Sequence, residues 1–159
     1  MINIHDVTED NVQEILKLKV LPAQNGFIET PAECLEEAEA CPQFKPVGLY
    51  EMEVLVGFAM YGCFSDGAGN SRLWLDRFLI DARFQGRGLG LRFMQAMLEK
   101  LEKLEAEFGK RPVYLSVYNE NEAAIRLYSK LGFRFTGELD DKGERVMLKK
   151  YTGGFGAAL

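Results

Sequence analysis

One short glycine-rich stretch, Gln85–Gly90 (QGRGLG), constrains the fold of this chain more than any other feature. An apolar run, residues 73–80, precedes it, and residues 91–108 have the apolar spacing of a helix. Alternating glycines let the backbone turn tightly and expose its N–H groups. The following helix adds unpaired N–H groups and the positive end of its dipole. We therefore expect a strand, a loop and a helix that together hold an anion, most often a phosphate, with Arg87 adding charge at the rim.

The residues of this loop leave three interpretations open. A plain glycine-rich connector would have the same composition. A Rossmann dinucleotide site would need Gly-x-Gly-x-x-Gly, whereas these glycines stand at positions 86, 88 and 90. A Walker loop would need Gly-Lys-Ser/Thr, which this stretch does not contain. The remaining pattern is Gln-x-x-Gly-x-Gly directly after a strand.

The composition is that of one globular domain. The chain has 159 residues, of which 47% are hydrophobic and 27% charged. We expect a single domain over residues 1–151 and a flexible C-terminal tail over residues 152–159. No apolar run reaches the length of a membrane span, and the first residues lack a signal-peptide pattern. These observations predict a cytoplasmic protein without a membrane partner.

The cysteine and histidine content argues against a metal site. Cys34, Cys41 and Cys63 form no Cys-x-x-Cys pair, and His5 is the single histidine. We interpret all three cysteines as buried reduced thiols, and we expect no bound metal. The net charge of −5 argues against nonspecific nucleic-acid binding, so no nucleic-acid partner is expected.

Hydrophobic periodicity predicts seven strands and four helices. The expected strands cover residues 2–7, 47–50, 54–64, 73–80, 113–117, 133–137 and 146–151, and the expected helices cover residues 12–19, 30–41, 91–108 and 122–131. The strands at 73–80 and 113–117 flank a helix, so they should run parallel, while the others pair as hairpins. The predicted fold class is a mixed α/β sheet, mostly antiparallel, with helices on both faces.

Two segments carry charges that need an explanation. The helix at 30–41 begins with a capping box, Thr30-Pro31-Ala32-Glu33, and most of its glutamates are interpreted as solvated. Glu29 lies before the cap, where it is free to point into a cleft. Asp76 and Arg77 interrupt the apolar strand at 73–80, one on each face. Charges inside a central strand are costly unless they are paired or used in chemistry.

The order of elements and two motifs together resemble the GNAT N-acetyltransferases over residues 2–150. Gln85, Gly88 and Gly90 fit the acyl-CoA motif of that family, and residues 119–133 (NENEAAIRLYSKLGF) resemble its second signature. Residues 45–50, 56–62 and 74–78 are similar, more narrowly, to bacterial spermine/spermidine (diamine) acetyltransferases. The resemblance implies acetyl transfer from acetyl-CoA to a primary amine of a polyamine in a ternary complex, by a homodimer. Another amine substrate, or a non-catalytic acyl-CoA sensor, stays open as an alternative.

The same resemblance assigns cofactor-binding residues. Backbone amides of residues 86–91 would hold the CoA pyrophosphate, and the strand at 78–80 would run beside the pantetheine arm. A splay between the two parallel strands would make room for this arm. A backbone N–H near Leu79 would polarise the acetyl carbonyl. The implied set is Phe78, Leu79, Ile80, Gln85, Gly86, Arg87, Gly88, Leu89, Gly90, Leu91 and Asn121.

The resemblance also implies catalytic and substrate-binding residues, each with a structural alternative. Tyr128 would protonate the leaving thiolate, or would simply pack on the core. Asp76 would receive the amine proton through water, or would form a salt bridge with Arg77. Glu29 would hold a distal ammonium, or would be a solvated loop acid. Tyr61 would line the amine channel, or would fill the sheet. Asn121 would contact CoA, or would only cap a helix.

Overall fold

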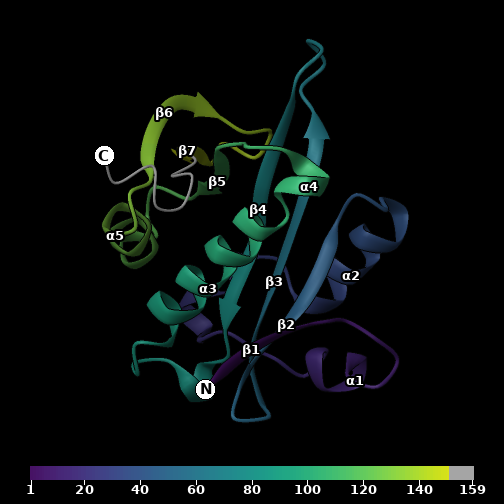
Figure 1. Cartoon of the computed structure of the whole chain (residues 1–159). Helices are drawn as coiled ribbons and strands as arrows, with labels where there is room; N and C mark the ends of the chain where they lie inside the picture. The colour runs from purple at the N-terminus through teal and green to yellow at the C-terminus, as the bar shows by residue number, and fades with distance from the viewer. Residues whose placement is uncertain (151–159) are drawn as a thin grey trace. The chain divides into compact units, whose positions relative to one another are not determined.

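A computed structural model describes residues 1–150, apart from the side chain of Glu105. The elements follow in the order β1 (Ile2–Asp6), α1 (Val12–Ile15), η1 (Pro22–Gln24), α2 (Pro31–Ala40), β2 (Lys45–Glu51), β3 (Val54–Ser65), β4 (Ser71–Ile80), η2 (Ala82–Phe84), α3 (Leu89–Lys103), α4 (Glu105–Phe108), β5 (Val113–Val117), α5 (Glu122–Lys130), β6 (Arg134–Leu139) and β7 (Arg145–Lys149) (Figure 1). The elements η1 and η2 are single turns of 3₁₀ helix. The predicted order is confirmed.

The strands form one seven-stranded sheet with the hydrogen-bonding order β1-β2-β3-β4-β5-β7-β6. β4 and β5 pair in parallel, through Leu73 with Val113 and Trp74 with Tyr114. The pairs β1–β2, β2–β3, β5–β7 and β6–β7 are antiparallel. The predicted mixed α/β fold class is therefore confirmed, including its parallel pair.

The chain divides into two compact units, which we describe separately. The first unit contains Met1–Gly62 and Leu75–Phe93, and the second contains Cys63–Trp74 and the chain from Met94 onward. A single domain over residues 1–151 stays a prediction, and the predicted tail at 152–159 lies outside the described residues. Within residues 1–150, no helix is both long and apolar enough to cross a membrane.

The first unit is built on the meander of β1, β2 and the first part of β3. β2 and β3 are joined at Met52 and Glu53, whose φ angles of 48° and 71° place both residues in the left-handed region that a tight hairpin requires. Figure 1 shows α2 beside β2. The capping box of α2 forms as predicted, with Thr30 Oγ1 accepting from Glu33 N at 3.2 Å and Glu33 Oε1 accepting from Thr30 N at 3.0 Å.

The core of the first unit joins α1 and α2 to the sheet. Its buried side chains are Ile15, Leu18, Cys34, Leu55, Phe58, Met60 and Leu79. Burying an aliphatic or aromatic side chain of this size contributes roughly 1.5–3 kcal/mol. The core therefore fixes α2 and the Leu75–Ile80 part of β4 within this unit, and these segments carry most of the charged residues described below.

The second unit combines β5, β7 and β6 with α5 and most of α3. Its buried apolar residues come mainly from these elements and include Met94, Met97, Leu98, Leu101, Val113, Leu115, Val117, Phe133, Val146 and Met147. Four of these residues, Met94, Met97, Leu98 and Leu101, recur at helical spacing on α3, so the apolar pattern at 91–108 marks a buried helix face. A hairpin turn at Asp140–Gly143 joins β6 to β7, with Gly143 N donating to Asp140 O at 3.1 Å.

Several predicted boundaries are wrong. The helix expected at 12–19 ends at Ile15, because Lys17 N and Leu18 N bond three residues back in a tight turn instead of four. The helix expected at 91–108 begins earlier, at Leu89, and breaks at Leu104 between α3 and α4. The prediction that all three cysteines are buried is also wrong. Only Cys34 is buried, while Cys41 and Cys63 are half-buried, and all three thiols are free.

Candidate active site

The glycine loop, Gln85–Leu91, joins η2 to α3 in the first unit. Gly86 and Gly88 have φ angles of 81° and 76°, which residues with a Cβ rarely adopt. A Cβ built at either position meets nothing within 4 Å, so backbone conformation rather than crowding demands glycine. Gly90 differs, because it lies in the first turn of α3. The loop therefore delivers backbone N–H groups to the N-terminus of a 15-residue helix, a favourable place for an anion.

Two arginines lie near the start of this loop. The guanidinium of Arg87 lies 5.5 Å from the centre of the Phe84 ring, and that of Arg83 lies 5.1 Å from the same ring. Arg83 is bound to Asp81 through Nε at 2.8 Å, so part of its charge is already matched. Arg87 is exposed and lies beside the glycines, and its contribution to anion binding stays a prediction.

The side chain of Gln85 points away from the loop. Its Nε2 donates to Ile80 O at 2.8 Å and to Gln24 Oε1 at 2.9 Å, and its Oε1 accepts from Gln24 Nε2 at 3.0 Å. These three bonds use both N–H groups and the carbonyl of the amide. Gln85 therefore holds the loop to its own unit, and a contact of Gln85 with the cofactor stays a prediction.

The strand segment Phe78–Ile80 forms the end of β4. Leu79 and Ile80 are buried, and Phe78 is half-buried. Gly57 of β3 faces this segment closely, because a Cβ built there would lie under 3.0 Å from Leu79 O. The close approach of the two strands at Leu79 therefore depends on a glycine, a requirement that the sequence alone did not reveal.

Arg77 is the centre of a charged cluster, which we call the Arg77 cluster and define as Arg77, Asp76, Glu29 and Glu37. The three nitrogens of its guanidinium each contact a different carboxylate. Nε lies 2.9 Å from Glu29 Oε2, Nη1 lies 2.9 Å from Asp76 Oδ2, and Nη2 lies 3.0 Å from Glu37 Oε1. Three anions around one cation leave this cluster with a net charge of −2.

The cluster is only partly exposed to water. The side chain of Arg77 is 11% exposed, and those of Asp76, Glu29 and Glu37 are 22%, 23% and 38% exposed. Burial works against the charge of Arg77, but the three carboxylates outweigh it and raise the pKa of the guanidinium. Burial is also the main reason that the pKa of the neighbouring Cys34 thiol is raised to about 12. Arg77 therefore stays charged and Cys34 stays a neutral thiol, as interpreted from the sequence.

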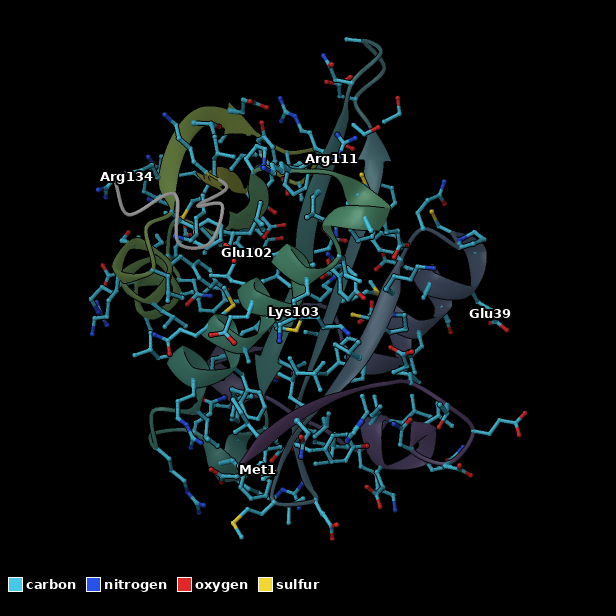
Figure 2. The ribbon with its side chains drawn as sticks, in the orientation of Figure 1. Met1, Glu39, Glu102, Lys103, Arg111 and Arg134 are labelled. Carbon is cyan, nitrogen blue, oxygen red and sulfur yellow. The ribbon has the colours of Figure 1, made fainter. Side chains whose placement is uncertain are left out.

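The Arg77 cluster brings together two of the predicted site residues. Asp76 and Glu29 both bind Arg77, so the salt-bridge alternative for Asp76 is present, and Glu29 is not a solvated loop acid. Glu37 was missed, because the sequence suggested that most glutamates of its helix are solvated. Glu39 of that helix is exposed and projects away from the ribbon (Figure 2). The signal that could have identified Glu37 is its place in the helix three residues after Cys34, which is buried.

Tyr61 lies in β3 of the first unit and is only 5% exposed. Burial to this degree agrees with the alternative that the residue fills the sheet.

The second unit carries the other two predicted residues, Tyr128 and Asn121. Tyr128 is half-buried in α5, and its ring packs edge-to-face on Phe133 with the centroids 6.0 Å apart. Desolvation by the protein, with a smaller contribution from Glu144, raises the pKa of the Tyr128 phenol to about 12. Asn121 is the N-cap of α5, and its Oδ1 accepts from Ala124 N at 3.4 Å. The capping alternative for Asn121 is therefore present.

The described residues show no group of His, Cys, Asp and Glu side chains that could hold a metal ion. The unit with the glycine loop thus offers two contrasting electrostatic features. One is an N–H-rich helix terminus with a nearby arginine, and the other is a cluster with a net charge of −2. The first suits an anion and the second suits a cation.

Comparison with known proteins identifies the family. Residues 12–133 match the model of the acetyltransferase (GNAT) family. The chain is 48% identical over 152 residues to the spermine/spermidine N(1)-acetyltransferase of Bacillus subtilis strain 168, with 94% of this chain and 98% of that protein covered. A probable spermine N(1)-acetyltransferase of Bacillus subtilis subsp. natto is 47% identical over the same fractions of the two chains.

Solved structures share the fold at lower identity. PaiA N-acetyltransferase of Thermoplasma acidophilum, solved with coenzyme A, has a TM-score of 0.66 and 16% identity, with 95% of this chain and 99% of that chain covered. Naa50 of Arabidopsis thaliana, solved with a bisubstrate analogue, has a TM-score of 0.66 and 19% identity, with 94% and 99% covered. The order of elements, the glycine loop before α3 and the match over residues 12–133 agree, so this chain belongs to the GNAT family of acetyltransferases.

Proposed function

We propose that the chain transfers an acetyl group from acetyl-CoA to a primary amine of a polyamine such as spermidine or spermine. The 48% identity to the Bacillus subtilis spermine/spermidine N(1)-acetyltransferase over 94% of the chain carries this proposal. The net charge of −2 on the Arg77 cluster supports it, because polyamines are cations. The GNAT family supports the reaction type.

The glycine loop fits the pyrophosphate of CoA. Gly86 and Gly88 have open space where a Cβ would stand, and both precede the N-terminus of α3, which is a suitable place for a phosphate group. We propose that the backbone N–H groups of residues 86–91 bind the pyrophosphate and that Arg87 adds charge. The end of β4, Phe78–Ile80, would run along the pantetheine arm. Acetyl-CoA supplies the acetyl group as a thioester.

We propose acid–base roles that the environment of each side chain supports. A neutral amine nitrogen attacks the carbonyl carbon of the acetyl group, the C–S bond breaks, and the thiolate takes a proton. Tyr128 donates that proton, because its raised pKa keeps the phenol protonated at neutral pH. The attacking nitrogen loses its proton through water toward Asp76, whose carboxylate is held by Arg77. Asp76 then releases this proton to water, and the Tyr128 phenolate takes one back, so both groups are restored. Glu29 attracts a distal ammonium of the same substrate.

The test measures release of free thiol from acetyl-CoA with spermidine, spermine, putrescine, an aminoglycoside and a peptide N-terminus. We expect turnover with the polyamines, loss of at least about 100-fold in kcat in Tyr128→Phe, and unchanged CoA affinity in that variant. Tyr114→Phe is the matched control, because it keeps the ring contacts with Trp74 and Arg72. Turnover confined to another amine would overturn the polyamine assignment, and CoA binding without any turnover would favour a sensor.

Two further expectations stay predictions, namely a cytoplasmic location and a homodimeric assembly. The polyamine proposal needs neither of them.

A further inference from the structure

A short segment before α2 is bonded to the start of the glycine loop. We call this segment, Lys19–Gln24, the clasp. Its first residue is held in both directions, since Lys19 N donates to Asp81 Oδ2 at 3.0 Å and Lys19 O accepts from Ala82 N at 2.7 Å. Asp81 is 3% exposed, the one charged residue among the buried polar side chains of residues 1–150. A buried carboxylate persists where hydrogen bonds satisfy it, so this end of the clasp is firmly placed.

The other end of the clasp is Gln24, which pairs with Gln85. The two side-chain amides exchange hydrogen bonds of 2.9 and 3.0 Å. Gln24 Oε1 also accepts from Leu21 N at 3.1 Å, which keeps the clasp folded in its 3₁₀ turn. The second N–H of the Gln85 amide donates to Ile80 O at 2.8 Å. The side chain that opens the glycine motif is therefore fixed by the clasp and by the end of β4.

The two glycines of the loop before α3, Gly86 and Gly88, cannot be fixed by side chains of their own. Gly86 and Gly88 have none, and a Cβ at either position would meet no neighbour within 4 Å. Glycines also lose more conformational freedom on ordering than other residues. The conformation of the loop therefore depends on what holds its two ends, which are α3 on one side and the bonded Gln85 on the other.

We propose that Gln24 is a positioning residue for the CoA pyrophosphate, acting through Gln85. This inference rests on the proposed function. Gln24 contacts no part of the ligand. It presets Gln85, so that the N–H groups of residues 86–91 converge before CoA arrives and less ordering is needed on binding. The pair should then affect affinity for CoA much more than the rate of the chemical step.

The test compares Gln24→Met, Gln85→Met and the double variant with the wild type by calorimetric titration of CoA. Methionine has a similar length, so the amide bonds are lost while the space stays filled. Gln13→Met is the control, because Gln13 is exposed on α1. We expect each single variant to bind CoA about tenfold more weakly, since both hydrogen bonds between Gln24 and Gln85 are lost together with one further bond, from Leu21 N in Gln24→Met or to Ile80 O in Gln85→Met. The double variant should bind about as weakly as Gln85→Met, well short of the sum of the two single losses, because both changes remove the same pair of Gln24–Gln85 bonds.

Steady-state rates separate positioning from a purely structural role. We expect kcat at saturating acetyl-CoA to stay within about threefold of the wild type in Gln24→Met, with the KM for acetyl-CoA raised in step with the Kd. A lower Tm with an unchanged Kd in Gln24→Met would overturn the inference, as would additive losses in the double variant. A wild type that binds no CoA would overturn the proposed function and this inference with it, so the two failures are distinguishable.

Discussion

Glu37 offers the sharpest test of whether the negative charge of the Arg77 cluster attracts the substrate. The charge of its carboxylate can be removed by Glu37→Gln without changing the shape of the side chain. Its carboxylate accepts from Arg77 Nη2 at 3.0 and 3.2 Å, and its side chain is 38% exposed. Glu37→Gln keeps one oxygen that can accept this bond but lowers the negative charge of the cluster from −2 to −1. Arg77 keeps Asp76 and Glu29 as partners, so we expect the fold to persist.

The size of the effect follows from Coulomb's law. A unit charge at about 6 Å from an ammonium, in an effective dielectric constant of about 40, contributes roughly 1.4 kcal/mol. We take a dielectric constant above that of a typical surface pair because Glu37 is more than one third exposed. A change of that size corresponds to about tenfold in kcat/KM for an amine with an additional ammonium. An amine without a second charge should lose far less.

The assay therefore compares spermidine with butylamine in wild type, Glu37→Gln and Glu39→Gln. Glu39 lies on the same helix but is exposed and projects outward, so its variant controls for the loss of charge on α2 (Figure 2). We expect a tenfold loss for spermidine in Glu37→Gln, less than about twofold for butylamine, and little change in Glu39→Gln. Equal losses for both amines in Glu37→Gln would refute the reasoning, because they would show a structural effect.

Three further outcomes are expected. Gly57→Ala should lower kcat/KM by about 100-fold and also lower the Tm, because the added Cβ would push Leu79 O away. Steady-state kinetics and thermal melting test this expectation, and unchanged activity would contradict it. Burial acts to raise the pKa of Asp81, but bonds from Arg83 and Lys19 hold it below 3.8. The contribution of Asp81 to the free energy of unfolding should therefore be complete above pH 3.8 and should be lost as the pH falls through the lower pKa of the folded state. Urea unfolding between pH 5 and 3 measures this pH dependence, and Asp81→Asn should reduce it. Because the pKa of Tyr128 is raised to about 12, loss of its proton should not lower kcat below about pH 10. A profile of kcat against pH from 7 to 10 tests this expectation.

The sequence predicted the elements well wherever the local signal was also the structural cause. The capping box at Thr30 and the N-cap at Asn121 could be predicted from the sequence because their hydrogen bonds join residues only three positions apart. The helix of α3 could be predicted because the helical spacing of its apolar residues coincides with their burial. The first helix was overextended because Val12–Lys19 has helical spacing, whereas the turn after Ile15 tightens.

The candidate site was predictable only where residue type alone limited the choice. Gly86 and Gly88 could be assigned because a positive φ selects glycine locally. The partners of Gln85 could not, because Gln24 is 61 positions away and a glutamine can bond in many ways. The need for glycine at position 57 could not be predicted either, because it arises from the carbonyl of Leu79 on another strand.

Arg77 shows why a charge inside a strand is informative even when its partners are not. Burial of a guanidinium is tolerated only when carboxylates match it, so the sequence already required acids near residue 77. One carboxylate would have been enough for neutrality, yet three lie within 3.0 Å. Each carboxylate attracts Arg77, but the three anions also repel one another. A cationic substrate would relieve that repulsion on binding. The unfavourable electrostatic energy of the free protein would therefore increase its affinity for a polyamine.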